Sequence, residues 1–342
     1  MTYINRKWGY AAVLVLLAAM VACGDKSAPA NPPLKENAAE AATADRQTET
    51  PKEAKTGTAP GVAAAVQVDE TKASELQSQF QGEPSKVVVA SVAIAEILDV
   101  LDVTPVGVPT STVALPDKFK DIRRIGSALK PDVEQVANLQ PDVVLGPESI
   151  KNSLEKQFKP AKLKTAYVPS DSLEELKLST VVLGRVFKQE QKANAFIASM
   201  EKHEREAVSL AQDKTGPKVL LLFGSAESFM MMNENTFAGS IAKKLGASNV
   251  VSDVLKSEET YLPLNMENVV TANPDVILLV SHGDPQAAIQ KFEADVKKNG
   301  AWEKLNAFKN KRVQALDYNL FGVASIVKAA DGYKEMLGLL YP

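Results

Sequence analysis

The sequence reads Glu134-Gln-Val-Ala-Asn-Leu-Gln-Pro-Asp-Val-Val144 in its first half and Glu267-Asn-Val-Val-Thr-Ala-Asn-Pro-Asp-Val-Ile277 in its second. In both copies a glutamate lies seven residues before the proline of Pro-Asp, and β-branched residues follow. Each copy therefore predicts a short helix that ends before Pro-Asp and a buried strand that begins there. Pro-Asp-Val is also a common helix-to-strand turn, but the shared glutamate and spacing favour an internal repeat and two similar lobes.

Strand patterns alternate with helical patterns around both copies. The predicted strands are residues 86–90, 104–109, 142–146, 165–168, 218–223, 275–280 and 312–316. Continuous apolar runs, such as residues 220–223, are typical of strands that are covered on both faces. We therefore expect an α/β fold of two Rossmann-like lobes with mostly parallel sheets.

Residues 188–213, between the two copies, are rich in charge and contain no glycine or proline. Phe196, Ile197 and Met200 form an apolar stripe that is typical of an amphipathic helix. At about 1.5 Å per residue, this helix would reach about 40 Å. One long helix that joins two lobes leaves a cleft between them, and such clefts are preferred ligand sites.

The N-terminus has the pattern of an export signal. Arg6 and Lys7 precede an apolar run of about 13 residues, whereas a membrane span needs roughly 20. The run ends in Met20-Val21-Ala22-Cys23, which resembles a bacterial lipobox, and Cys23 is the chain's one cysteine. We expect acylation of Cys23 after removal of residues 1–22; a plain secretory signal with a chance cysteine is the alternative.

The segment after Cys23 is rich in Ala, Pro, Thr, Glu and Lys and has no aromatic residue before Phe80. Such a segment cannot bury enough apolar area to offset the entropy lost on ordering. The expected organisation is a signal peptide at 1–22, a lipidated and disordered tether at 23–83, an N-terminal lobe at 84–187, a connecting helix at 188–213 and a C-terminal lobe at 214–342.

Composition limits the classes of function. The chain has 342 residues, with 39 lysines and arginines against 42 aspartates and glutamates, for a formal net charge of −3. This balance argues against a nucleic-acid partner, because nucleic-acid-binding proteins usually carry a basic surplus or patch. One cysteine excludes a disulfide framework and a multi-cysteine metal site, and two histidines leave little room for a polyhistidine site.

An acylation signal, two α/β lobes and a connecting helix together resemble the substrate-binding lipoproteins of ABC importers, in the iron-siderophore, cobalamin and haem cluster. Within this cluster, residues 85–341 look most similar to the haem-receptor lipoproteins of the iron-regulated surface determinant system of Gram-positive bacteria. The segments that carry the resemblance are Gly107-Val-Pro-Thr-Ser111, residues 115–126, Pro131-Asp-Val-Glu134, residues 273–278, His282-Gly-Asp-Pro285 and Phe321-Gly322.

The resemblance implies a fold of the class III periplasmic-binding-protein type. It also implies a monomeric receptor outside the cytoplasm, held by lipid at a Gram-positive cell membrane, with no enzymatic activity and no catalytic cofactor. The cargo would be haem, received in part from upstream cell-surface haem proteins and delivered to an ABC permease with its ATPase.

In that family, a histidine from the second lobe and a methionine from the first hold the haem iron. The histidine maps onto His282, which follows a predicted strand and so would face a crevice. The methionine maps onto Leu129, which cannot coordinate iron. Haem would then have one protein ligand, or another group would supply the second, or the cargo would be different. Without the family, the residues favour a histidine that caps a turn with Gly283 and Asp284 over an iron ligand.

Other candidate ligands are Met230, Met231 and Met232, with Tyr167 and Tyr261 as further ones. Methionine is mostly a packing residue, so these rest on nearness to a cleft alone. Thr110, Ser111 and Arg124 match family segments at the first-lobe rim, where they would contact anionic groups of haem. Arg124 fits a surface ion pair equally well. His203 lies in the predicted connecting helix, and we expect it to be a solvated residue.

Glu134 and Glu267 occupy the same place in the two copies of the repeat. In this importer class, one glutamate on each lobe docks against arginines of the permease, so the resemblance assigns docking to this pair. The alternative is a helix-start carboxylate that the helix dipole favours.

Other functions have less support. A receptor for a ferric siderophore is the first alternative, and a cobalamin receptor is the next. The sequence has no Gly-x-Ser-x-Gly and no His-Glu-x-x-His motif, which argues against an extracellular enzyme. A structural adhesin would need repeats or a cell-wall motif, and the sequence shows neither.

Overall fold

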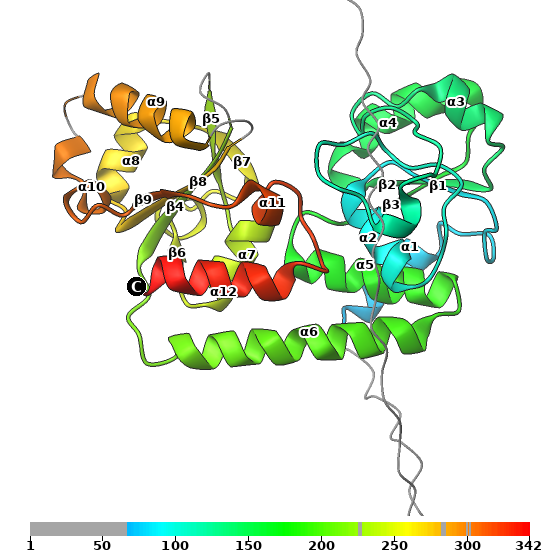
Figure 1. The fold of residues 1–342 in the computed structure, drawn as a ribbon, viewed down its shortest axis with the longest axis horizontal. Coiled ribbons are helices and arrows are strands. Elements are labelled where there is room, and N and C mark those ends of the chain that lie inside the picture. The colour runs from blue at the N-terminus through cyan, green and yellow to red at the C-terminus, as the bar shows by residue number, and fades with distance from the viewer. Residues whose placement is uncertain (1–66, 225–227, 282–284, 299, 301) are drawn as a thin grey trace, which may run out of the picture. The chain divides into compact units, whose positions relative to one another are not determined.

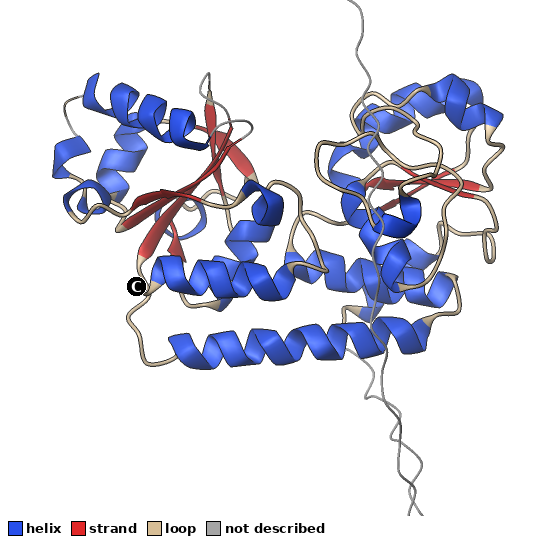
Figure 2. Cartoon of the chain, viewed as in Figure 1, coloured by secondary structure: helices blue, strands red, loops and turns tan. Residues whose placement is uncertain are grey.

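The computed structural model describes residues 67–342, apart from 225–227, 282–284, 299 and 301. These residues belong to one compact unit. They build two α/β lobes, each around its own sheet, as Figures 1 and 2 show. The expectation of two lobes with mostly parallel sheets is confirmed.

The N-terminal lobe has a three-stranded parallel sheet in the order β1-β2-β3. Its strands are β1 (Val87–Val89), β2 (Val143–Pro147) and β3 (Thr165–Val168), and its helices are α1 (Glu70–Gln77), α2 (Val92–Val100), α3 (Val133–Asn138), α4 (Lys151–Phe158) and α5 (Leu173–Val186). The strands are almost wholly buried because helices cover both faces.

The C-terminal lobe has a sheet in the order β7-β5-β4-β8-β9, with β6 also paired to β4. Its strands are β4 (Lys218–Gly224), β5 (Phe229–Met232), β6 (Ser248–Asn249), β7 (Tyr261–Pro263), β8 (Val276–Ser281) and β9 (Val313–Ala315), and its helices are α7 (Phe237–Lys244), α8 (Met266–Ala272), α9 (Pro285–Lys298), α10 (Asn306–Lys309), α11 (Tyr318–Phe321) and α12 (Ala329–Leu340). β4, β6, β8 and β9 are parallel, whereas β5 pairs antiparallel with β4 and β7.

The sequence repeat is also a structural repeat. Gln140 and Asn273, the residues before each Pro-Asp, both have left-handed backbones, with φ of 49° and 46°. After each turn the aspartate ties the new strand to its neighbour. Asp142 accepts backbone N–H bonds from Ser85 and Lys86 at 2.8 Å, and Asp275 accepts one from Lys218 at 3.0 Å. The same local interactions therefore begin the same strand in both lobes.

Apolar side chains of β4 divide the core of the C-terminal lobe into two parts. Leu221 packs with residues of α7 and α12, whereas Leu220 and Leu222 pack on the opposite face with residues of α9. Successive strand residues point to opposite faces, so a continuous apolar run is what a sheet with helices on both sides requires.

A long helix, α6 (Glu190–Ala211), connects the lobes. It packs against α5 and α12, which lie beside it in Figure 1. Its buried side chains repeat at helical spacing and are Ala193, Ile197, Met200, Ala207 and Ala211. The predicted connecting helix at 188–213 thus corresponds to a real helix two residues shorter at each end.

The predicted disorder of residues 23–83 is wrong for its last part. Residues 70–77 form α1, in which Ala73 and Leu76 are buried against Leu178 of α5. Asp69 caps the helix by accepting the N–H of Lys72 at 3.0 Å. The low aromatic content gave no sign of this helix, because one alanine and one leucine suffice when a neighbouring helix supplies the rest of the apolar surface.

The predicted strand at 104–109 is also wrong. It forms isolated bridges through Gly107 and Val108 rather than a strand. The two prolines at 105 and 109 provide no N–H group, so they prevent a continuous ladder.

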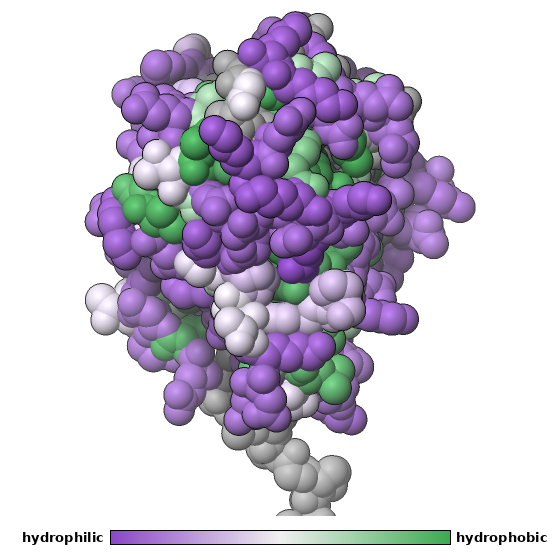
Figure 3. Space-filling model, turned by 90° about the vertical axis from the view of Figure 1, so that its left-hand side faces the viewer, coloured by the Kyte–Doolittle hydropathy of each residue, from purple (hydrophilic) through white to green (hydrophobic). Residues whose placement is uncertain are grey.

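The surface of the C-terminal lobe that Figure 3 presents is mostly hydrophilic, with hydrophobic residues scattered among charged ones. No helix in the described part of the chain is both long and apolar enough for a bilayer crossing.

Candidate functional site

A cavity with a volume of about 230 Å³ opens between the lobes. This is somewhat smaller than typical small-molecule sites, which have volumes of about 300–1,000 Å³. The N-terminal lobe contributes Ser91, Ala93, Pro147, Ser149, Ser170 and Asp171, and the C-terminal lobe contributes Phe223, Met232, Thr236, Phe237, Ala238, Tyr261, Phe321, Gly322, Val323 and Ala324. One wall is thus made largely of small polar side chains and the other of apolar and aromatic ones.

The parallel strands place these residues at one edge of each sheet. Ser91 follows β1 and caps α2, and Pro147 ends β2. Phe223 is the last residue but one of β4. Ligands of α/β proteins bind at such carboxyl ends of strands, where loops leave a crevice. The carboxyl ends of strands from both sheets therefore border the same cavity.

Gly224 ends β4 in a conformation that requires glycine. Its φ is +155°, and a Cβ at this position would lie 2.1 Å from the carbonyl oxygen of Ser228. This close approach permits the chain to reverse into the antiparallel strand β5, which brings Met232 to the cavity.

The segment after α11 forms part of the cavity lining and reaches the other lobe. Ser325 donates a hydrogen bond of 2.6 Å to the Glu96 carboxylate on α2, and both residues are buried. Burial raises the pKa of Glu96 to about 7, although the hydrogen bond from Ser325 and the charge of Lys328 act to lower it. A titratable contact between the lobes therefore lies next to the cavity.

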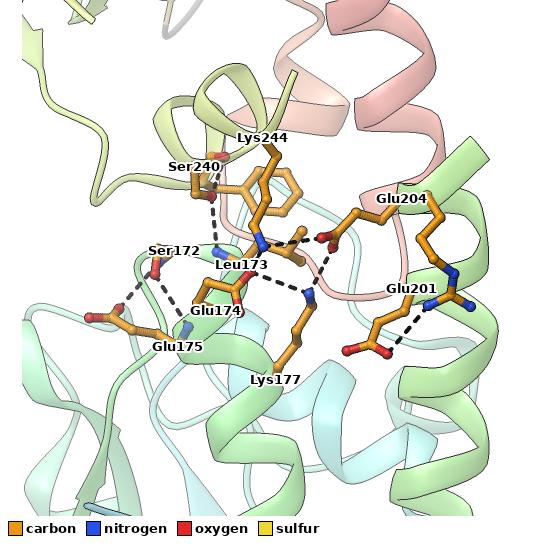
Figure 4. Close-up of polar contacts among 11 residues, drawn as sticks. Ser172, Leu173, Glu174, Glu175, Lys177, Glu201, Glu204, Ser240 and Lys244 are labelled. Atoms are coloured by element: carbon orange, nitrogen blue, oxygen red, sulfur yellow. Dashed lines mark hydrogen bonds and ion pairs between the residues drawn. The ribbon is translucent and has the colours of Figure 1, made fainter. Parts of the chain in front are cut away.

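An ion-pair cluster joins α5, α6 and α7 (Figure 4). Glu204 contacts Lys177 at 2.7 Å and Lys244 at 3.2 Å, and Lys244 also contacts Glu174 at 3.0 Å. Although burial acts to raise the pKa of Glu204, the hydrogen bond and charge of Lys177, with Lys244, lower it. We call Lys177, Glu174, Glu204 and Lys244 the inter-lobe ion cluster.

A second link lies nearby in Figure 4. Ser172 and Glu175 form a capping box at the start of α5, and Leu173 N–H donates to Ser240 Oγ of α7 at 3.1 Å. The N-terminus of α5 is therefore held by its own cap and by the C-terminal lobe.

Two predicted functional residues, His282 and Cys23, lie outside the described residues. The residue before His282 is Ser281, the end of β8, which is in register with Gly224 of β4. Its neighbour Val280 is in register with Phe223, which lines the cavity. The strand that leads to His282 is thus adjacent to the cavity wall.

The candidate methionines have different surroundings. Met232 lines the cavity, Met231 is fully buried on the opposite face of the sheet, and Met230, on the same face of the strand as Met232, is partly buried. Leu129 is 61% exposed and is not among the residues described as lining the cavity. Of the two tyrosines, Tyr261 lines the cavity and Tyr167 is buried within the N-terminal lobe.

Thr110 and Arg124 lie together in a separate open depression of the N-terminal lobe. Arg124 donates to the carbonyl oxygen of Lys120 at 3.0 Å, and Ser111 Oγ accepts the N–H of Val113 at 3.0 Å. The described lining of the inter-lobe cavity includes none of these three predicted contacts.

Glu134 and Glu267 are exposed in the first turns of α3 and α8. In each helix a side chain immediately before the first turn provides the cap, Asp132 in one and Asn265 in the other. The glutamates are therefore not needed as caps and leave their carboxylates at the surface.

The sequence reasoning missed Asp171 and Glu96. Ser170-Asp-Ser172 begins one residue after the predicted strand 165–168, and Ser172 with Glu175 has the spacing of a capping box, which is a usable signal. Glu96 gave no signal, because its partner Ser325 lies 229 residues away in the chain.

The chain belongs to the periplasmic binding protein family, whose model matches residues 87–320. It is 31% identical over 274 residues to the high-affinity heme uptake system protein IsdE of Staphylococcus aureus, which covers 79% of this chain and 92% of that protein.

Two solved structures are also similar. An ABC transporter substrate-binding protein from Listeria monocytogenes EGD-e has 34% identity and a TM-score of 0.69, covering 76% of this chain and 99% of that one. S. aureus IsdE complexed with heme has 31% identity and a TM-score of 0.69, covering 75% and 99%. These relatives confirm the prediction of a binding protein of this family rather than an enzyme.

Proposed function

We propose that the protein is the substrate-binding component of an ABC importer, and that it captures haem in the cavity between its lobes for delivery to the permease. The observation that carries the proposal is the 31% identity to a heme uptake protein over 79% of the chain, together with a cavity at the matching strand ends. The aromatic and apolar wall suits one face of a macrocycle.

His282 is the proposed iron ligand. Its predecessor Ser281 ends a buried strand beside Phe223, so the chain leaves the sheet next to the cavity. Neutral imidazole is a common haem ligand. Met232 is the one candidate methionine that lines the cavity, and Thr110, Ser111 and Arg124 remain proposed contacts for anionic groups of the cargo.

Glu134 and Glu267 are the proposed docking residues for the permease. Both are exposed and lie at equivalent positions in the two copies of the repeat. Exposed charges contribute little to stability but determine orientation and encounter rate. A matched pair, one on each lobe, fits a partner that contacts both lobes at once.

The same role places the protein outside the cytoplasm. We propose that Cys23 is acylated and that the acyl chains hold the protein at the membrane beside the permease, with residues between Cys23 and α1 as the tether. Replacement of Cys23 by alanine would then release the protein into the medium.

A ferric siderophore is the second candidate cargo, and Leu129 favours it. The family position for the methionine ligand carries a side chain that cannot bind iron, so a haem site here lacks that ligand.

The test is a titration of the full chain with haem, a ferric tris-catecholate and cobalamin in separate experiments, by absorption spectroscopy and thermal unfolding. We expect haem alone to give a saturable spectral change and to stabilise the fold by about 2.7 kcal/mol at 100-fold its Kd. Saturable binding of another cargo, with no change in spectrum or stability on addition of haem, would contradict the proposal.

A further inference from the structure

Charge is distributed unevenly over the cavity lining. Among the described lining residues, Asp171 is the one side chain that carries a formal charge at neutral pH, and none is lysine, arginine or histidine. Asp171 lies on the N-terminal wall, and the aromatic Tyr261 lies on the wall of the other lobe. The described part of the cavity is therefore acidic on one side and uncharged on the other.

The carboxylate of Asp171 is held in place. Its Oδ1 accepts a hydrogen bond from Ser149 Oγ at 3.1 Å. Its backbone N–H donates to Glu175 Oε2 at 2.7 Å, and the N–H of Ser172 reaches the same oxygen at 3.2 Å. Glu175 belongs to the capping box of α5, visible in Figure 4, so the start of this helix fixes the position of Asp171.

The charges around Asp171 are also negative. No ion pair in the described part of the chain joins Asp171 to a lysine or arginine, and Glu148 and Glu175 interact with it as like charges. Burial raises the pKa of Asp171, and Glu148 adds to this rise. Burial raises the pKa of Tyr261 to about 12, with a further contribution from Asp171. The negative charge of Asp171 therefore acts electrostatically on a residue of the other wall.

We propose that Asp171 determines the charge class of the cargo: it admits a ligand whose buried part is uncharged and rejects chelates that carry several negative charges into the cavity. The inference rests on the proposed function and makes it more specific. A porphyrin enters with its uncharged ring and keeps its propionates away from the acidic wall. A ferric tris-catecholate is triply negative around its whole surface, so no orientation avoids Asp171. Repulsion of this kind rejects a competitor without any new contact to the preferred ligand.

The test compares wild-type chain with Asp171→Asn and Asp171→Ser. Asparagine keeps an oxygen that can accept the bond from Ser149, and thermal unfolding checks that each variant is folded. Glu155→Gln, on α4, removes one negative charge from the same lobe outside the described cavity lining, and serves as the matched control. Calorimetric titrations use three probes: ferrous haem, ferrous haem dimethyl ester, which is uncharged, and the ferric complex of N,N-dimethyl-2,3-dihydroxybenzamide, a tris-catecholate with a charge of −3.

We expect both Asp171 variants to bind the ferric tris-catecholate about 10-fold or more tightly than wild type, since a weakly screened charge pair at short range is worth at least that factor. Affinity for the uncharged dimethyl ester should stay within about 2-fold, and Glu155→Gln should resemble wild type with every probe.

The outcomes separate the two proposals. Equal affinities of the wild type and both Asp171 variants for the tris-catecholate overturn the role of Asp171 alone. Wild-type protein that fails to bind haem overturns the proposed function. Wild-type protein that binds the tris-catecholate more tightly than haem overturns both.

Discussion

The two lobes share a repeated frame but line the cavity in different ways. Each lobe has a capped helix, a left-handed residue before Pro-Asp and an aspartate that begins a buried strand. The N-terminal wall nevertheless consists largely of small polar side chains and Asp171, and the C-terminal wall of aromatic and apolar ones. The repeated parts build the frame, and the parts that are not repeated build the site.

The antiparallel strands β5 and β7 account for much of this difference. They extend the sheet of the C-terminal lobe beyond β4 and bring Met232 and Tyr261 to the cavity, where Tyr261 packs near Phe223 with ring centroids 6.2 Å apart. The described sheet of the N-terminal lobe has only its three parallel strands, so the loops after them provide the wall. A ligand held between such unequal walls has one orientation that suits both.

The largest expected effect concerns the cluster that couples the lobes. Lys177→Met leaves the Glu204 side chain, which is only 12% exposed, with Lys244 as its remaining partner, and we expect a loss of about 3 kcal/mol in the free energy of unfolding. Urea denaturation measures it. Lys202→Met is the control, because Lys202 is 70% exposed and its pair with Glu206 is 4.0 Å long, so its effect should stay within about 0.5 kcal/mol. Equal losses would show that burial of the cluster does not couple the lobes.

The next effect concerns Glu96, which joins the lobes beside the cavity. A rise in pKa from 4.5 to about 7 means that the folded protein holds this proton more tightly than the unfolded chain. The stability from this group is therefore complete below pH 4.5, falls as the pH rises to about 7 and then stays constant, a change of up to about 3 kcal/mol.

Glu96→Gln removes this titration. We expect the variant to exceed the wild type in unfolding free energy at pH 8, to approach it at pH 4, and to depend less on pH between these values. Glu75→Gln, at an exposed position on α1, is the control and should follow the wild type. Parallel curves for Glu96→Gln and wild type would contradict the assignment.

A smaller change, in the free energy of haem binding, should distinguish the two histidines of the chain. His282→Ala should weaken haem binding at least about 100-fold, or about 2.7 kcal/mol, because loss of outer-shell partners alone costs about 10–100-fold. His203→Ala should bind normally, since this side chain is half exposed on α6 and lies 3.5 Å from Glu206. Spectra of the haem complex measure both, and an unchanged spectrum for His282→Ala would remove it from the site.

The smallest effect on stability is expected at Glu134 and Glu267, the equivalent positions of the repeat. Glu134→Ala and Glu267→Ala, alone or together, should change the unfolding free energy by less than about 0.5 kcal/mol and leave haem affinity unchanged. Uptake by cells should fall with each single change and fall further with both, because each lobe provides one docking charge. Normal uptake by the double variant would leave the repeat with a purely structural role.

Much of the frame could be predicted from the sequence because its signals are local. The repeat around Pro141 and Pro274 predicted equivalent strands, and the charged stretch around Met200 predicted the connecting helix. The helix α1 was missed because its two buried side chains need α5 to complete a core. Thr110 and Arg124, expected at the first-lobe rim from family segments, line an open depression of that lobe, and their contact with the cargo stays a prediction.

The amino-acid sequence by itself determined the lobes, the repeat and the family, because caps, proline turns and apolar runs act between near neighbours in the chain. Only the tertiary structure decided that Asp171 and Tyr261 line the same cavity and that Glu96 is buried against Ser325. These pairings join segments far apart in sequence, and the charge and protonation of each group depend on which distant surface removes it from water.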